Sequence, residues 1–285
     1  MENYDVVIIG AGPAGISASL YLVRSNKKTL VLYSSTAEVE KAAKIDNYYG
    51  FDGGISGKDL YQNGIKQAMS IGASVKNEEV LDIKMDANTY TLYTKDNTYN
   101  AKAIILATGN KRLKPNIKNI DLFEGRGVSY CAICDGFFYR KKKVGIIGAG
   151  DYAISEANEL SNVTNNITIY TNGDKVSEST IYPVIDKKIV SLEGEDKLSK
   201  IVFEDGSIDS IDGLFIALGS ASGVDFAKKL GIITENDSIV VNDDMQTNIA
   251  GIYACGNVTG GLLQVSKAVY EGAKSALSVI KYLNK

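Results

Sequence analysis

Two stretches of the chain share one pattern of apolar and polar positions. Residues 6–17 (VVIIGAGPAGIS) and 144–155 (VGIIGAGDYAIS) each run from a β-branched apolar segment through glycines into a helical pattern. A second apolar segment follows each of them, at 28–33 and 166–170. Strands that alternate with amphipathic helices are typical of parallel sheets with right-handed crossovers. The pattern therefore predicts two βαβ units.

A hairpin and a buried strand are predicted after each unit. Residues 89–109 alternate between polar and apolar side chains around Asp96-Asn97 and end in AIILATG. Residues 201–219 repeat this plan around Asp205-Gly206. The duplication therefore covers whole domains. The predicted fold is α/β, with two Rossmann-like three-layer domains, the second inserted in the first.

The chain is expected to leave the first domain and return to it. A strand at 251–258 and a helix over 262–283 complete the first domain. We expect the crossings near Arg112–Pro115 and Val240–Asp244. Residues 1–112 and 244–285 then form the first domain, and residues 113–243 form the central domain.

Composition excludes several kinds of chemistry. The 285 residues carry a net charge of −3, too small to favour nucleic acid or a membrane surface as a partner. No apolar run approaches the ~20 residues of a membrane span, and the N-terminus lacks a secretory signal, so a cytoplasmic location is expected. The chain has no histidine, which excludes imidazole bases, Ser-His-Asp triads and histidine metal ligands.

The first glycine turn predicts a nucleotide site. Glycines between a strand and a helix permit a tight turn and the close approach of a pyrophosphate, which then faces the helix N-terminus. Tyr33 and Ser34 occupy the strand end where an acidic residue usually binds the ribose, so Ser34 or Ser35 could bind it instead. The candidate contacts in the turn are Gly10, Gly12, Pro13, Ala14 and Gly15.

A pair of cysteines precedes the second glycine turn. Cys131 and Cys134 lie in YCAICDGFFY with Asp135 directly after them. A zinc site lacks ligands, because zinc usually needs four and only Cys255 is left. An inert core pair does not explain the CxxC spacing beside an acid. A reducible disulfide, with Asp135 moving the proton, is the favoured interpretation, and Cys255 is expected to be a small core residue.

Four motifs together resemble the low-molecular-weight thioredoxin reductases: GAGPAG at the start, ILATG at 105–109, EGRGVSYCAICDGFFYRKKKVGIIGAG at 124–150 and GIYACGNV at 251–258. The resemblance covers essentially the whole chain. It implies an FAD-binding domain made of both chain ends, a central domain that carries the CxxC pair, and a homodimer. It also implies that electrons pass from FAD to Cys131/Cys134 and on to thioredoxin, with Asp135 as the acid/base.

The resemblance assigns further flavin contacts near both chain ends. The family usually has Gly-Asp where this chain has Gly256-Asn257, and Arg-Gln where it has Leu263-Gln264. An asparagine can still hydrogen-bond a hydroxyl group, so FAD is expected. The assigned contacts are Asn47, Thr108, Gly109, Gly256, Asn257, Gln264 and Val265.

The second nucleotide site departs from the family pattern. NADPH-dependent members carry arginines after the second βα unit, but this chain has Tyr170-Thr171-Asn172-Gly173, followed by Asp174. A 2′-phosphate has no clamp there, and no acid is present for an NADH ribose. The turn Gly148-x-Gly150-x-x-Ala153 is explained by close packing of helix and strand. No NADPH is therefore expected.

In this respect the chain resembles the ferredoxin-dependent flavin thioredoxin reductases. Ferredoxins are typically acidic, so the basic runs at 111–114 and 140–143 are candidate docking segments, or else solvated loops. An NAD(P)H-dependent reductase with a clamp from Lys175 or Lys187/Lys188 stays open as an alternative. So do a different redoxin or a small disulfide as the substrate, and a non-catalytic flavoprotein that senses redox state.

Overall fold

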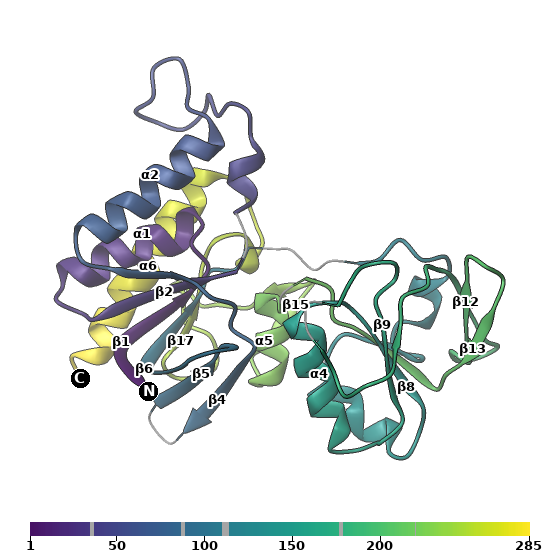
Figure 1. Ribbon diagram of the computed structural model, residues 1–285. Helices are drawn as coiled ribbons and strands as arrows, with labels where there is room; N and C mark the ends of the chain where they lie inside the picture. The colour runs from purple at the N-terminus through teal and green to yellow at the C-terminus, as the bar shows by residue number, and fades with distance from the viewer. Residues whose placement is uncertain (35–36, 87–88, 110–113, 177–178, 220) are drawn as a thin grey trace. The chain divides into compact units, whose positions relative to one another are not determined.

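The computed structural model describes residues 1–34, 37–86, 89–109, 114–176, 179–219 and 221–285. The chain divides into two compact units (Figure 1). Unit 1 comprises Met1–Lys111 and Ser222–Lys285, and unit 2 comprises Arg112–Ala221. The second crossing thus precedes the expected Val240–Asp244.

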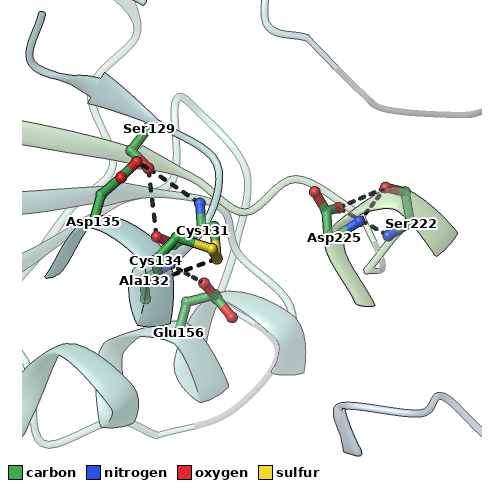
Figure 2. Close-up of a disulfide and its surroundings, with 8 residues drawn as sticks. All are labelled: Ser129, Cys131, Ala132, Cys134, Asp135, Glu156, Ser222 and Asp225. Carbon is green, nitrogen blue, oxygen red and sulfur yellow. Dashed lines mark hydrogen bonds between the residues drawn. A yellow bond between two sulfur atoms is a disulfide. The ribbon is translucent and has the colours of Figure 1, made fainter. Parts of the chain in front are cut away.

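Residues 222–243 belong to unit 1 because of how their helix packs. Helix α5 (Gly223–Lys229) starts with a capping box, in which the Ser222 hydroxyl accepts from Asp225 N and the Asp225 carboxylate accepts from Ser222 N (Figure 2). A Cβ on Gly223 would overlap Thr108 and Val258. The hydrophobic pattern of this segment does not say which sheet it joins, so the sequence did not predict this boundary.

Unit 1 is built on a seven-stranded sheet in the order β3-β2-β1-β6-β5-β4, with β17 paired to β6. The first half of β6 pairs with β5 in an antiparallel hairpin, and its last residues pair with β17 in parallel. A separate pair, β15 and β16, follows α5. The strands are β1 (Glu2–Ile9), β2 (Thr29–Tyr33), β3 (Ser74–Asn77), β4 (Asp82–Asp86), β5 (Thr89–Tyr93), β6 (Thr98–Leu106), β15 (Thr234–Glu235), β16 (Ser238–Ile239) and β17 (Ile252–Ala254).

Three long helices pack with this sheet around one apolar core. Helix α1 (Pro13–Arg24) has proline at its first position, where the missing N–H costs nothing. It lies beside α6 (Val265–Leu283), with α2 (Gly57–Ser70) next to it (Figure 1). Helix α6 starts later than predicted, because Gly260 and Gly261 have positive φ and Gln264 is extended. Two short 3-10 helices are η1 (Glu38–Lys41) and η4 (Gly256–Thr259).

Unit 2 contains a five-stranded parallel sheet in the order β10-β9-β8-β14-β7 and a three-stranded antiparallel sheet in the order β11-β12-β13. Its apolar core joins the two sheets. The strands are β7 (Val128–Ser129), β8 (Val144–Ile147), β9 (Ile167–Tyr170), β10 (Val184–Ile185), β11 (Ile189–Glu193), β12 (Lys200–Phe203), β13 (Ile208–Ser210) and β14 (Gly213–Ile216). The helices are η2 (Ile120–Phe123), α3 (Ala132–Asp135), η3 (Gly136–Tyr139) and α4 (Asp151–Ser161).

The predicted βαβ units are confirmed. β1 and β2 pair in parallel around α1, and β8 and β9 pair in parallel around α4. The two predicted hairpins are β5–β6 and β12–β13. None of the helices in the described ranges has the length and apolarity needed to cross a membrane.

Candidate functional site

A disulfide joins Cys131 and Cys134 across the single turn of α3 (Figure 2). Cys131 is buried and Cys134 is exposed. The amide of Cys134 donates to Cys131 Sγ (3.2 Å). The exposed position of Cys134 does not fit an inert core pair. The described residues also contain no group of three or more possible ligands for a metal ion.

Asp135 is held beside this disulfide by a serine. The Ser129 hydroxyl donates to Asp135 Oδ2 (2.6 Å) and accepts from the amide of Cys131 (3.1 Å). The half-buried carboxylate is thus linked through one hydroxyl to the backbone of the cysteine turn. Burial raises the pKa of Tyr139, and the negative charge of Asp135 raises it further, so the two side chains lie near each other.

A buried carboxylate that the sequence did not single out contacts the same turn. Glu156, on α4, is 1% exposed. Its Oε2 accepts from the amide of Ala132 (3.0 Å), between the two cysteines (Figure 2). Helical periodicity could place Glu156 on the buried face of α4, but no sequence signal links it to a segment more than twenty residues earlier.

The first glycine turn has a closed side and an open side. A Cβ on Gly10 would overlap the carbonyl of Ala107, and a Cβ on Gly15 would overlap the carbonyl of Gly10. Among the described residues, a Cβ on Gly12 would meet only Ala37 Cβ, at 3.7 Å. Helix α1 has no side-chain cap and no acidic residue in its first turn. The amides after Pro13 are therefore free to bind an anionic group.

The strand end beside this turn holds two buried polar atoms. Tyr61 OH, on α2, and Glu40 Oε2, on η1, have no hydrogen-bond partner within the described part of the chain. Burial raises the pKa of Tyr61 to about 12, and the neighbouring Tyr33 and Glu40 add to the shift. Ser34 is exposed, and Ser35 lies outside the described residues. Glu40 is thus a candidate for the carboxylate that the sequence pattern lacked after β2.

A cavity of about 120 Å³ lies against the turn. Gly12 and Pro13 line it from α1, Tyr48 and Tyr61 from the next segment, and Val265 from α6. Its lining is mostly apolar, as expected for part of a pocket that binds a large cofactor.

Several predicted contacts from distant segments meet near this turn. Asn47 Nδ2 donates to Gln264 Oε1 (3.0 Å). A Cβ on Gly256 would lie 2.8 Å from Ala14 Cβ, so the C-terminal motif packs directly on α1. Thr108 and Gly109 follow β6, and a Cβ on Gly109 would have no neighbour within 4 Å in the described part of the chain. Asn257, the second residue of η4, is half-buried.

A buried ion pair holds the η4 loop. Lys267 Nζ contacts Glu271 Oε2 (3.0 Å), and the side chains are 15% and 11% exposed. Glu271 also accepts from the amide of Gly256 (2.8 Å), and Lys267 donates to the carbonyls of Gly256 (2.9 Å) and Gly260 (2.5 Å). The Thr259 hydroxyl contacts both charged groups. The spacing of four residues on α6 allows this pair, but no sequence signal indicates its role in the loop.

The second glycine turn differs from the first at its helix. A Cβ on Gly148 would overlap the carbonyl of Ala217 and lie 2.7 Å from Ala153 Cβ, so close packing explains the retained motif. Helix α4 begins with Asp151, an acidic residue in the position that Pro13 has in the first turn. A carboxylate there opposes the binding of a pyrophosphate.

The strand end after β9 is occupied by internal hydrogen bonds. Asn172 Oδ1 accepts from the amide of Ile189 (2.7 Å), and the Tyr170 hydroxyl donates to Asp209 (2.7 Å). Burial and Asp209 raise the pKa of that hydroxyl. Lys187 pairs with Asp205 (2.6 Å). These side chains are thus engaged in hydrogen bonds and an ion pair within unit 2.

Comparison with known proteins agrees with this arrangement. A family model described as pyridine nucleotide-disulphide oxidoreductase matches residues 4–272. A thioredoxin reductase of Aquifex aeolicus is 33% identical over 302 residues, which cover 99% of this chain and 94% of that one. The chain belongs to the low-molecular-weight thioredoxin reductase family.

Two solved structures of thioredoxin reductases are close to this one. The atypical thioredoxin reductase TRi from Desulfovibrio vulgaris Hildenborough is 42% identical, with a TM-score of 0.92, over 98% of this chain and 97% of that one. A ferredoxin-flavin thioredoxin reductase from Clostridium acetobutylicum is 34% identical, with a TM-score of 0.74, over 100% and 99% of the two chains. This thioredoxin reductase family member is therefore a disulfide oxidoreductase.

The family implies FAD, and unit 1 fits it. The uncapped, acid-free N-terminus of α1 suits a pyrophosphate, and the open side of Gly12 leaves room for its approach. The oxygen of Glu40 that has no partner among the described residues is a candidate acceptor for ribose hydroxyls. Asn47 and Gln264 offer amide groups at the start of α6. These residues would hold the cofactor in this reductase.

Proposed function

We propose that the chain is a flavin-dependent thioredoxin-disulfide reductase whose electrons come from reduced ferredoxin rather than from NAD(P)H. The observation that carries this proposal is the second glycine turn, where Asp151 begins α4 and the end of β9 lacks basic residues. Both features oppose the binding of a dinucleotide phosphate. The likeness to a ferredoxin-flavin thioredoxin reductase supports the same donor.

The energetics of this transfer are favourable. A low-potential ferredoxin has a reduction potential of about −400 mV, and thioredoxin has one of about −270 mV. The difference of ~130 mV corresponds to about 6 kcal/mol for two electrons. Ferredoxin delivers one electron at a time, whereas a disulfide accepts two. FAD, when bound, supplies the conversion between the two kinds of carrier.

The cysteine turn then carries out the disulfide exchange. Reduction of the Cys131–Cys134 bond takes up two electrons and two protons. One thiol loses its proton to Asp135 and attacks the thioredoxin disulfide, whose S–S bond breaks as a mixed disulfide forms. The second thiol then attacks the mixed disulfide, which restores the Cys131–Cys134 bond and releases thioredoxin as a dithiol. The two protons of the reduced pair pass to the thioredoxin sulfurs, one of them by way of Asp135. Ser129 holds Asp135 in place for this proton transfer.

Docking of an acidic ferredoxin uses exposed basic groups in this proposal. Arg140 and Lys142 lie over the rings of Phe137 and Tyr139, and Lys143 pairs with Asp209. In the other basic run, Lys114 pairs with Asp121 and Glu124, and residues 111–113 lie outside the described ranges. Arg140–Lys142 is therefore the better candidate. We also propose a homodimer and a cytoplasmic location.

An NAD(P)H-dependent reductase is the second candidate, favoured by family members that use this donor. Of the lysines considered as a clamp, Lys187 is engaged by Asp205 and Ser207, and the stem of Lys188 lies against Gly173. A phosphate clamp made by these two lysines would require both side chains to rearrange, whereas Lys175 is exposed.

The deciding experiment follows flavin absorbance under anaerobic conditions while NADPH, NADH and reduced ferredoxin are added separately. Bleaching by ferredoxin alone is the expected result, and prompt bleaching by either nucleotide overturns the proposal. The matched variant is Cys134→Ser, which keeps flavin reduction but abolishes thioredoxin turnover. Turnover that survives this change would mean that Cys131/Cys134 is not the relay and that electrons reach the substrate by another route.

A further inference from the structure

The backbone amides of the CxxC turn donate to acceptors of different kinds. At a helix N-terminus, free amides normally stabilise a cysteine thiolate and lower its pKa. Here the amide of Cys131 donates to Ser129 and the amide of Cys134 donates to Cys131 Sγ. The amide of Ala132 instead donates to the carboxylate of Glu156 (3.0 Å). A negative group thus takes one of the donors that would otherwise favour a thiolate.

Glu156 is well placed to act on the cysteines through the turn. It is 1% exposed, so water does not screen its charge from neighbouring groups. Helix α4 packs on α3, and the carboxylate is directed at the residue between the two cysteines (Figure 2). Because like charges disfavour each other, a carboxylate at this position disfavours a thiolate on the reduced pair.

We infer that Glu156 is a positioning residue that keeps the reduced Cys131/Cys134 pair protonated and strongly reducing. The inference rests on the proposed role of this pair as the redox relay. A thiolate stabilised by its surroundings makes the disulfide a better oxidant, because the reduced form is favoured. Glu156 acts in the opposite direction, which suits a protein that must give electrons to its substrate. Asp135 then takes the proton at the moment of attack.

Other titratable groups surround the turn and stay constant in the test. Asp135 lies on α3 itself, and Tyr139 of η3 faces Asp135. Helix α4 also carries Asp151, Tyr152 and Glu159. Glu156→Gln removes the charge but keeps an oxygen that can accept from Ala132. Glu159→Gln removes a charge from the same helix and is the matched control.

The test measures the midpoint potential of the Cys131/Cys134 couple in the full-length FAD-loaded protein from pH 6 to pH 10. Thiol redox buffers set the potential, and acid quenching followed by alkylation and mass spectrometry reports the reduced fraction of this pair. The break in the pH dependence marks the pKa of the first thiol. Buried Cys255 lies in a different peptide and does not interfere.

In Glu156→Gln the break is expected to move down by about one pH unit. The potentials of the variant and the wild type coincide at pH 6, where both dithiols are protonated. Above both break points the variant favours the reduced form about tenfold more, a potential about 30 mV less negative. Glu159→Gln behaves as the wild type.

An unchanged break point in Glu156→Gln overturns the inference and leaves Glu156 as a structural hydrogen-bond acceptor. Glu156→Met, which fills the same space without charge, gives the same readout should the glutamine variant not fold. Failure of the proposed function is a separate result. A couple that titrates reversibly, with the shift in the variant, but never reduces thioredoxin refutes that function and not the role of Glu156.

Discussion

The ion pair between Lys267 and Glu271 gives the sharpest prediction about the flavin side of the molecule. Both groups are largely buried, and both bind the η4 loop that carries Asn257. Replacing Lys267 with methionine keeps the length of the stem but removes the charge and the donors to Gly256 and Gly260. Glu271 then keeps two donors, the amide of Gly256 and the hydroxyl of Thr259.

The expected loss of stability depends on the charge and the hydrogen-bond partners that remain in each variant. Removing one partner of a fully buried ion pair costs about 3–5 kcal/mol, because the other charge stays uncompensated. The remaining donors to Glu271 and the partial exposure of both groups reduce this to about 2 kcal/mol for Lys267→Met. In Glu271→Gln, Lys267 keeps two carbonyls and the Thr259 hydroxyl, so we expect a similar loss.

The assay is urea unfolding of unit 1 together with FAD binding to the apoprotein. The double variant Lys267→Met/Glu271→Gln should lose about 1–2 kcal/mol less than the sum of the two single losses, since no unpaired charge remains. FAD affinity should fall in each single variant because the loop is less well held. Lys281→Met, on the exposed face of α6, is the control and should change stability by less than about 0.5 kcal/mol.

Strict additivity of the two single losses would refute this account, because it would mean that the charges do not interact. Unchanged FAD affinity in a variant that has lost stability would mean that the pair supports the fold of α6 and not the loop. The two results are distinct, since the first concerns the electrostatic coupling and the second its consequence for Asn257.

Three further predictions follow. Glu40→Gln should weaken FAD binding about tenfold, or about 1.4 kcal/mol, because the ribose loses a charged acceptor; equal affinity of the variant in fluorescence titration would place the ribose elsewhere. Gly15→Ala should abolish FAD retention on purification, because the new Cβ overlaps the carbonyl of Gly10, and a flavin-loaded variant would contradict that contact. Burial raises the pKa of Cys255 to about 12, so its thiol should stay protonated and unreactive toward a disulfide reagent up to pH 9 in the native protein and react only on denaturant unfolding.

Local patterns in the sequence were sufficient for most of the fold. Period-two and helical patterns predicted both βαβ units and both hairpins, because each of these forms between neighbours in the chain. The unit to which α5 belongs could not be predicted in this way. Its place depends on the contact of Gly223 with Thr108 and Val258, which lie far away in sequence.

The same difference between local patterns and long-range contacts decides which parts of the candidate site could be predicted. The glycine turn and the CxxC pair are contiguous motifs, so the sequence contained them. Glu40, Tyr61 and Glu156 were missed because each acts on a segment that only the folded chain brings near. An acid that binds the ribose usually stands at the end of β2, whereas Glu40 lies seven residues beyond it. Its position near Tyr61 depends on the course of η1 in the folded chain.

The two glycine turns also show which positions of this motif carry information about a ligand. Gly10 and Gly148 both lie where a Cβ would overlap a backbone carbonyl, so packing alone preserves them. Gly12 and Gly150 both have an open side as far as the described residues go. The turns differ at the next residue, Pro13 or Asp151, and a carboxylate there competes with a bound phosphate for the positive end of the helix. A glycine motif therefore indicates a strand–helix packing that can bind a dinucleotide, and the charge of the residue that begins the helix favours or opposes a phosphate there.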